Sequence, residues 1–224
     1  MKRRIALLSV LVAASLAAQD WAVARLEKSP RHREWVTVKH GGRSVETFVA
    51  YPESAAKTPV VVVIHEIFGM TDWVQDLADQ VAEAGYIAVA PDLLSGMAPN
   101  GGRTKDFAPN TVMEAISHLD PDQVTADLNA AADYGLQLPA SNGKLFAAGF
   151  CWGGGQTFRF STNRADLKAA FVFYGPPPPA EAMAKIQAPV YGFYAGNDSR
   201  IDAQIPAIKI TKTATRVGLR IRSM

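Results

Sequence analysis

The sequence predicts an α/β fold, a mostly parallel sheet with helices on both faces, and two features indicate it. Strand-like and helix-like segments alternate along the chain, which is the pattern of parallel strands joined by crossover helices. One strand, Pro59 to His65 ("PVVVVIH"), is continuously apolar and β-branched, as a strand covered on both faces should be. With 224 residues, 48% hydrophobic and 20% charged, the chain has the size and composition of one domain with a sizeable core.

The first half of the predicted domain starts with a hairpin and continues into alternating strands and helices. Gly41 and Gly42 form the turn of the hairpin. A helix follows the buried strand and places Trp73, Leu77 and Val81 on one face, ending at Gly85. The expected elements are strands at 34–39, 44–51, 59–65 and 86–90, helices at about 71–85 and 121–136, and a long loop at 91–110.

The second half of the predicted domain carries further strands and a tail of different character. Strands are expected at 144–150, 169–175 and 189–196, with a helix starting just after Cys151. The tail at 205–224 has five basic residues, no acidic residue and no clean apolar stripe. We therefore expect one domain over 34–224, with 205–224 as an atypical tail.

The N-terminus has the features of a secretory signal. Lys2, Arg3 and Arg4 precede an apolar run from Ile5 to Ala18 that is too short for a comfortable membrane span. We expect residues 1–18 to be a removable signal peptide and the mature protein to be exported, either periplasmic or secreted, with no stable membrane span. An uncleaved anchor and a buried N-terminal helix are the alternatives.

Charge and cysteine content narrow the choice of partner. Removing residues 1–18 takes away three basic and no acidic residues, so the formal charge moves from +2 to −1. A nearly neutral protein has no electrostatic case for binding nucleic acid. The single cysteine, Cys151, cannot form an internal disulfide, so it is either buried and inert or kept for its chemistry.

Cys151 lies in "GFCWGGG", directly after a predicted strand and before a predicted helix. Gly149 and Gly153 complete a G-x-C-x-G pattern, which is typical of a nucleophile elbow where small residues let strand and helix pack closely. The positive end of the helix favours the thiolate, and the backbone N–H of Trp152 would point at a developing oxyanion. The alternative is a small buried hydrophobe in a glycine-rich turn.

Two acidic residues follow other strands at the same edge of the predicted sheet, where such sheets bind ligands. Glu66 follows the buried strand and would hold or deprotonate Cys151; alternatively it is a loop carboxylate paired with an arginine. Asp198, in "YAGNDSRI", follows a later strand, as the acid of a triad does, although Gly-Asn-Asp is also an ordinary turn. His65 is expected to bond to backbone.

Five motifs, "HEIFGM", "APDLLSG", "GFCWGG", "FYG" and "YAGNDSRI", resemble in order and spacing the dienelactone hydrolase family of α/β-hydrolases. The resemblance implies a hydrolase of lactones or small esters, with Cys151 as nucleophile, Asp198 as triad acid and Glu66 paired with the thiol before substrate binds. It also implies an oxyanion hole from the N–H groups of Ile67 and Trp152, and no metal or organic cofactor. The partner is then a small-molecule ester or lactone. Arg103 lies in the region of the family's substrate-carboxylate arginines, but its motif does not match closely.

The sequence departs from this family at the triad histidine, which should follow the acid. None of the 26 residues after Asp198 is histidine, and the four histidines, His32, His40, His65 and His118, all precede Cys151. A truncation or frame change near Ile205 and a variant with another base are both compatible with this pattern. Two functions stay open: a thiol hydrolase with impaired turnover, and a catalytically silent fold retained for binding small ligands.

Overall fold

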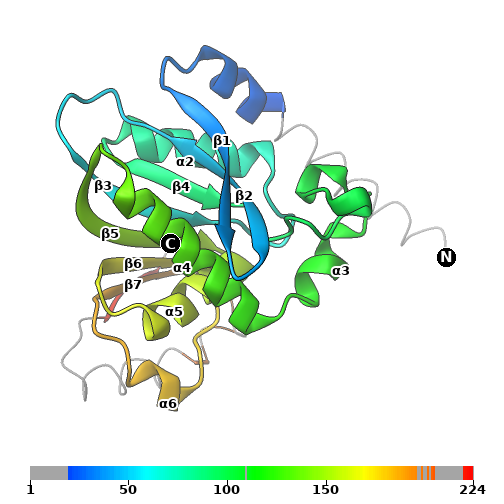
Figure 1. Ribbon diagram of the computed structural model, residues 1–224. Helices are drawn as coiled ribbons and strands as arrows, with labels where there is room; N and C mark the ends of the chain where they lie inside the picture. Colours follow the sequence, from blue (N-terminus) through cyan, green and yellow to red (C-terminus); the bar gives the residue numbers. More distant parts are fainter. Residues whose placement is uncertain are drawn as a thin grey trace.

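The computed structural model describes residues 20–223 except 109, 196–197, 199–200, 202 and 205–218 (Figure 1). Within these residues the strands form one sheet in the order β1-β2-β4-β3-β5-β6-β7-β8. The strands are β1 (Arg33–His40), β2 (Arg43–Ala50), β3 (Thr58–Ile64), β4 (Ile87–Pro91), β5 (Ser141–Phe150), β6 (Leu167–Phe173), β7 (Val190–Tyr194) and β8 (Leu219–Ser223).

The sheet is mostly parallel, as predicted. β1 and β2 form the expected hairpin and β2 pairs antiparallel with β4, whereas every pairing from β4 to β8 is parallel. The carboxyl ends of β3, β5, β6 and β7 therefore meet at one edge, and the loops that follow them share that edge.

Helices cover both faces of the sheet, and the side chains of β3 alternate between them. Val60, Val62 and Ile64 pack toward α4 (Pro121–Gln137) and α5 (Trp152–Asn163), whereas Val61 and Val63 pack toward α2 (Asp72–Glu83) on the opposite face. The continuously apolar sequence of β3 is explained by this double burial. The helices are one at 20–28, α2 (Asp72–Glu83), α3 (Val112–Ser117), α4 (Pro121–Gln137), α5 (Trp152–Asn163) and α6 (Ala180–Met183).

Several elements differ from the sequence-based expectation. The region expected as a loop at 91–110 contains two short 3₁₀ turns, η1 (Pro99–Gly101) and η2 (Thr104–Asp106), and α3 follows it. β5 begins at Ser141 rather than Lys144, because Ser141 pairs with Thr58 of β3 through the backbone. Apolar periodicity does not report backbone pairing of polar residues, so these segments gave no signal.

Most of the predicted atypical tail, 205–218, lies outside the described residues, and a strand lies near its end. Leu219–Ser223 forms β8, which pairs in parallel with β7 at the edge of the sheet. Alternation of Leu219 and Ile221 with Arg220 and Arg222 is the period-two pattern of an edge strand, which a search for a continuously apolar strand overlooks.

The predicted signal peptide at 1–18 lies outside the described residues, and export stays a prediction. Across the part of the chain that the structure describes, no helix has the length and apolar character needed to cross a membrane.

Candidate active site

Cys151 occupies a sharp turn between β5 and α5. Its backbone has φ 53° and ψ −118°, a conformation that non-glycine residues rarely adopt, and it stands at the N-cap position of α5. Its N–H donates to the carbonyl of Phe173 at the end of β6, at 3.0 Å. The structure thus gives Cys151 the strained strand-to-helix geometry that the G-x-C-x-G pattern predicts.

The glycines around Cys151 are required by close approach of three segments. A Cβ on Gly149 would lie 2.3 Å from the carbonyl oxygen of Gly153, and one on Gly153 would lie 2.2 Å from that of His65. A Cβ on Gly154 would lie 2.5 Å from the carbonyl oxygen of Phe173. Each of these neighbours is backbone, so side chains at these glycines would force α5 away from the sheet.

Glu66 follows β3, the strand that pairs with β5, and is half-buried. Its carboxylate accepts the N–H of Phe68 at 3.1 Å, and its carbonyl accepts the N–H of Gly69 at 3.1 Å, which defines a tight turn. Burial raises the pKa of Glu66 to about 7, against the opposing effect of the N–H groups of Phe68 and Ile67. Among the described residues no arginine forms an ion pair with Glu66, and near neutral pH this carboxyl group can both accept and release a proton.

Tyr174, the middle residue of "FYG", lies at the site but was not predicted to have a role there. It follows β6 with φ 42°, and its N–H donates to the carbonyl of Phe193 at 2.8 Å. Burial raises the pKa of its phenol, and the negative charges of Cys151 and Glu66 raise it further. The Tyr174 ring meets that of Phe150, the residue directly before Cys151, edge-on with 6.1 Å between centroids, so Tyr174 lies beside the elbow. The sequence signal that could have identified Tyr174 is the position of "FYG" at the end of β6, the strand that pairs with β5.

The two N–H groups expected at the oxyanion hole lie in turns at this edge. Trp152 is the first residue of α5, where an N–H has no partner within the helix. Ile67 belongs to the turn that Glu66 starts. The indole of Trp152 stacks on the His65 ring, with 5.5 Å between centroids, so the two turns are in contact.

Asp198 lies after β7, two strands from β5 in the sheet. Its carboxylate accepts the N–H of Ile201 at 3.3 Å, and its own N–H donates to the carbonyl of Ala195 at 3.3 Å. These bonds form the ordinary turn that was the alternative interpretation, and the triad role of Asp198 stays a prediction.

The polar contacts of the four histidines are with groups other than Cys151. His65 is buried, with Nδ1 bonded to the carbonyl of Glu66 and Nε2 accepting the N–H of Leu93, and burial lowers its pKa. His65 therefore bonds to backbone, as expected. His40 contacts the carboxylate of Asp127 at 2.7 Å, His32 lies 3.9 Å from Glu34, and His118 contacts the carbonyl of Glu114 at the end of α3.

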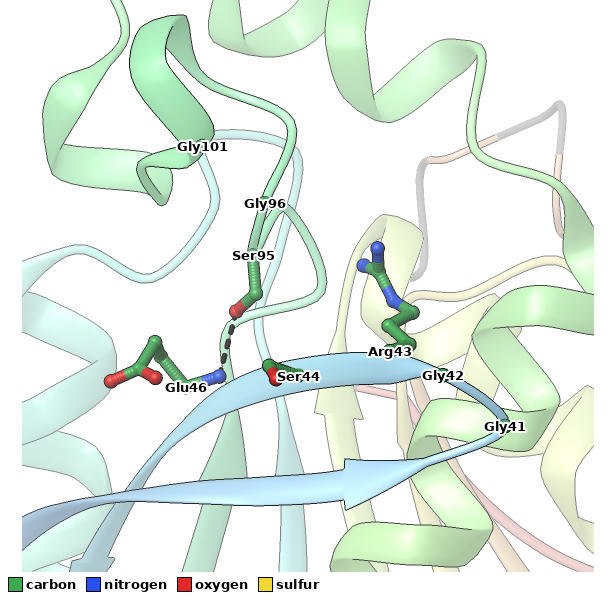
Figure 2. Close-up of a pocket in the computed structure, with 8 residues that line it drawn as sticks. All are labelled: Gly41, Gly42, Arg43, Ser44, Glu46, Ser95, Gly96 and Gly101. Carbon is green, nitrogen blue, oxygen red and sulfur yellow. Dashed lines mark hydrogen bonds between the residues drawn. The ribbon is translucent and has the colours of Figure 1, made fainter.

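A separate hollow of about 430 Å³ lies beside the β1–β2 hairpin (Figure 2). Its lining includes Arg43, Glu46 and Ser95, and the N–H of Glu46 donates to the hydroxyl of Ser95 at 2.9 Å. Cys151 and Glu66 do not line it, so this hollow is distinct from the elbow. Among the described residues, no cluster of three or more His, Cys, Asp or Glu side chains could hold a metal ion.

Comparison with known sequences places these features in a family. A model of the dienelactone hydrolase family matches residues 45–223. A Yersinia pestis protein named "Putative carboxymethylenebutenolidase" is 32% identical over 75% of this chain, and a Saccharolobus solfataricus protein of the same name is 32% identical over 74%. The match covers 66% of the Yersinia pestis protein and 75% of the Saccharolobus solfataricus protein.

Solved structures share the fold. A crystal structure from Klebsiella pneumoniae, named "Putative Dienelactone Hydrolase", superposes with a TM-score of 0.76 at 25% identity, covering 86% of this chain and 85% of that one. A dienelactone hydrolase from Anabaena variabilis gives a TM-score of 0.67 at 18% identity, covering 87% of this chain and 86% of that one.

Proposed function

The chain belongs to the dienelactone hydrolase family, and we propose that it hydrolyses lactones or small carboxylic esters through Cys151 as nucleophile. The observation that carries the proposal is the strained backbone of Cys151, φ 53°, at the start of α5. A structural thiol has no need of this geometry, because a glycine would adopt it without strain.

The first step is acylation. Glu66, with a pKa of about 7, takes the proton of the Cys151 thiol, and the thiolate attacks the ester carbonyl carbon. The N–H groups of Ile67 and Trp152 stabilise the negative oxygen. Collapse breaks the carbon–oxygen bond to the leaving alkoxide, which takes the proton back from Glu66 and leaves a thioester on Cys151.

The second step, attack of water on the thioester, needs a base. Asp198 has no histidine to orient in this sequence, and the four histidines are engaged elsewhere. General base catalysis contributes about 10²–10⁴-fold, so deacylation should be slower by roughly this factor. The proposed activity is therefore fast acylation followed by slow turnover.

A burst experiment tests the proposal. With p-nitrophenyl acetate, the chain should release about one equivalent of nitrophenolate rapidly and then turn over slowly. Intact-mass and peptide mass spectrometry should find one acetyl group on Cys151. Cys151→Ala should abolish both the burst and the added mass.

The alternative is a catalytically silent fold that binds small ligands, which the missing histidine favours. It predicts no burst and alkylation of Cys151 by iodoacetamide only after denaturation, whereas the proposal predicts alkylation of the native protein at pH 6. Rapid steady turnover that disappears in Cys151→Ala would instead show that another residue supplies the second base.

A further inference from the structure

Hydrogen bonds hold both ends of the turn at 65–70, which contains Glu66 and Ile67, to the loop that follows β4. The residues that do this take no part in the chemistry proposed above. They come from the segment at 92–104, which overlaps the "APDLLSG" motif and lies in the region expected to be a loop.

The first hydrogen-bonded contact is at the start of the turn. The buried ring of His65 is bonded through Nδ1 to the carbonyl of Glu66 at 2.9 Å, and its Nε2 accepts the N–H of Leu93 at 3.3 Å. Because Nε2 accepts from a backbone N–H, the ring is neutral with its proton on Nδ1. His65 thus links the Glu66 peptide to the loop after β4.

The second hydrogen-bonded contact is at the end of the turn. The hydroxyl of Thr104 accepts the N–H of Met70 at 3.1 Å and donates to the carboxylate of Asp92 at 2.7 Å. Asp92 is fully buried and also accepts the N–H groups of Thr104 and Leu94, at 3.0 and 3.1 Å. Gly69, with φ 76°, lies against Thr104 so closely that a Cβ there would be 2.6 Å from its hydroxyl oxygen.

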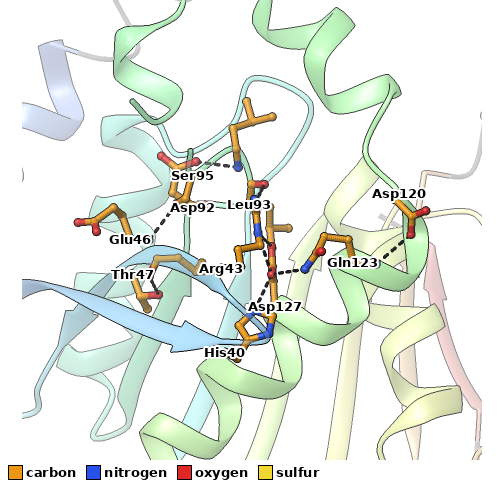
Figure 3. Close-up of polar contacts among 12 residues, drawn as sticks. His40, Arg43, Glu46, Thr47, Asp92, Leu93, Ser95, Asp120, Gln123 and Asp127 are labelled. Carbon is orange, nitrogen blue, oxygen red and sulfur yellow. Dashed lines mark hydrogen bonds and ion pairs between the residues drawn. The ribbon is translucent and has the colours of Figure 1, made fainter. Parts of the chain in front are cut away.

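The loop that holds the turn is itself held on its other side. The carbonyl of Leu93 accepts from Arg43 at 3.1 Å, and Arg43 is bound by the buried carboxylate of Asp127 on α4 (Figure 3). The hydroxyl of Ser95 accepts the N–H of Glu46 on β2. Asp92 and Thr104 therefore connect the turn to a segment that β2 and α4 already fix.

We propose that Asp92 and Thr104 are positioning residues, which hold the Glu66–Ile67 turn in register with Cys151. The inference rests on the proposed function, since it assigns these residues a purpose in that reaction. Both side chains are buried, so they would act on the reaction through the turn. Removing the Thr104 hydroxyl frees the end of the turn at Met70, and a displacement of about 1 Å in a site can cost roughly 10²-fold in rate.

The test compares Thr104→Val with Thr104→Ser. Thr104→Val keeps the shape and removes the hydroxyl, so the rate of the p-nitrophenyl acetate burst should fall about 10- to 100-fold. The influence of a carboxylate on a thiol falls with distance, so a displaced Glu66 should act like a missing one. The pH midpoint for alkylation of Cys151 by iodoacetamide should therefore move in the same direction in Thr104→Val as in Glu66→Gln. Thr104→Ser keeps the hydroxyl and should restore both.

Thr47→Val is the matched control. Thr47 is a buried threonine on β2 whose hydroxyl donates to the carbonyl of Val45, at 3.2 Å. This variant loses one buried hydroxyl bond, so its thermal unfolding temperature should fall while burst rate and alkylation midpoint stay unchanged. A purely structural role for Thr104 predicts the same behaviour in Thr104→Val.

The outcomes separate this inference from the proposed function. A folded Thr104→Val with the burst rate and midpoint of the parent overturns the positioning role. If the pH midpoint for alkylation of Cys151 is also unchanged in Glu66→Gln, the proposed role of Glu66 is wrong. The burst rate of Thr104→Val then still tests whether Thr104 holds Ile67, which lies in the same turn. Should Thr104→Val not fold, Thr104→Ala removes the same hydroxyl with less bulk beside Gly69.

Discussion

At the scale of single residues, the site depends on places where a side chain has no room. Gly153, two residues after Cys151, brings α5 against the carboxyl end of β3, where a Cβ would meet the carbonyl oxygens of His65 at 2.2 Å and Ile64 at 2.5 Å. Neither oxygen belongs to a side chain that can rotate away. The close contact of α5 with β3 is therefore set by the absence of one methyl group.

Gly153→Ala should lower the free energy of unfolding by about 1–3 kcal/mol, the usual cost of overpacking, although alanine favours a helix by roughly 0.5–1 kcal/mol. It should also slow alkylation of Cys151, because the elbow moves. Gly155→Ala in the same helix is the control: its nearest contact is a Pro176 side-chain carbon at 3.1 Å, so unfolding should change little. Equal losses in the two variants would contradict this account; denaturant unfolding measures both.

Residues with local patterns could be predicted from the sequence, and residues defined by contacts across loops could not. Cys151 between two glycines and Glu66 after an apolar strand are local signals, and the structure places both at the expected edge of the sheet. Thr104 meets Met70 across 34 residues of sequence, a contact that no periodicity reports. Tyr174 was visible only as part of a motif.

At the scale of elements, the segment at 20–33 is fastened to α2 through buried carboxylates. Arg31 forms a two-pronged pair with Asp79, with Nε–Oδ1 at 3.1 Å and an Nη–Oδ2 distance of 2.6 Å, and Ser29 donates to the same carboxylate at 2.7 Å. Arg25 reaches Asp76 at 3.1 Å. This docking was not predictable from the amino-acid pattern, because Asp76 and Asp79 look like the polar side of an amphipathic helix.

Arg31→Met should lower the free energy of unfolding by about 3 kcal/mol, because it leaves the carboxylate of Asp79, 2% exposed, without its main partner. Arg31→Met combined with Asp79→Leu should recover most of the loss, since no buried charge is then left uncompensated. Asp122→Asn is the control, because the carboxylate of Asp122, which pairs with Arg159, is 94% exposed. Its loss should lower the free energy of unfolding by less than about 1 kcal/mol. Urea unfolding of the four proteins decides; equal costs for Arg31→Met and Asp122→Asn would refute the docking.

At the scale of the whole molecule, two neighbouring residues make stability depend on pH in opposite directions. Burial raises the pKa of Glu66 from 4.5 to about 7, so the folded protein binds more protons than the unfolded chain between these values, and stability falls as pH rises. Burial lowers the pKa of His65 below 6.5, so the unfolded chain binds more protons there, and stability falls as pH drops below 6.5. Two adjacent groups at the candidate site, His65 and Glu66, therefore both affect how the stability of the fold depends on pH.

Glu66→Gln separates these two effects, because glutamine stays neutral and can still accept the N–H of Phe68 through its amide oxygen. Below pH 4.5 the glutamate of the parent is protonated in both states, so the two proteins should unfold at nearly the same temperature. Above pH 7 the parent must hold an ionised, half-buried carboxylate, so Glu66→Gln should be the more stable protein while acylating Cys151 more slowly. Glu114→Gln, at an exposed position on α3, should track the parent at every pH. Thermal unfolding from pH 4 to 9 measures the difference, and a constant offset between Glu66→Gln and the parent would mean that Glu66 has the same pKa in the folded and unfolded chain.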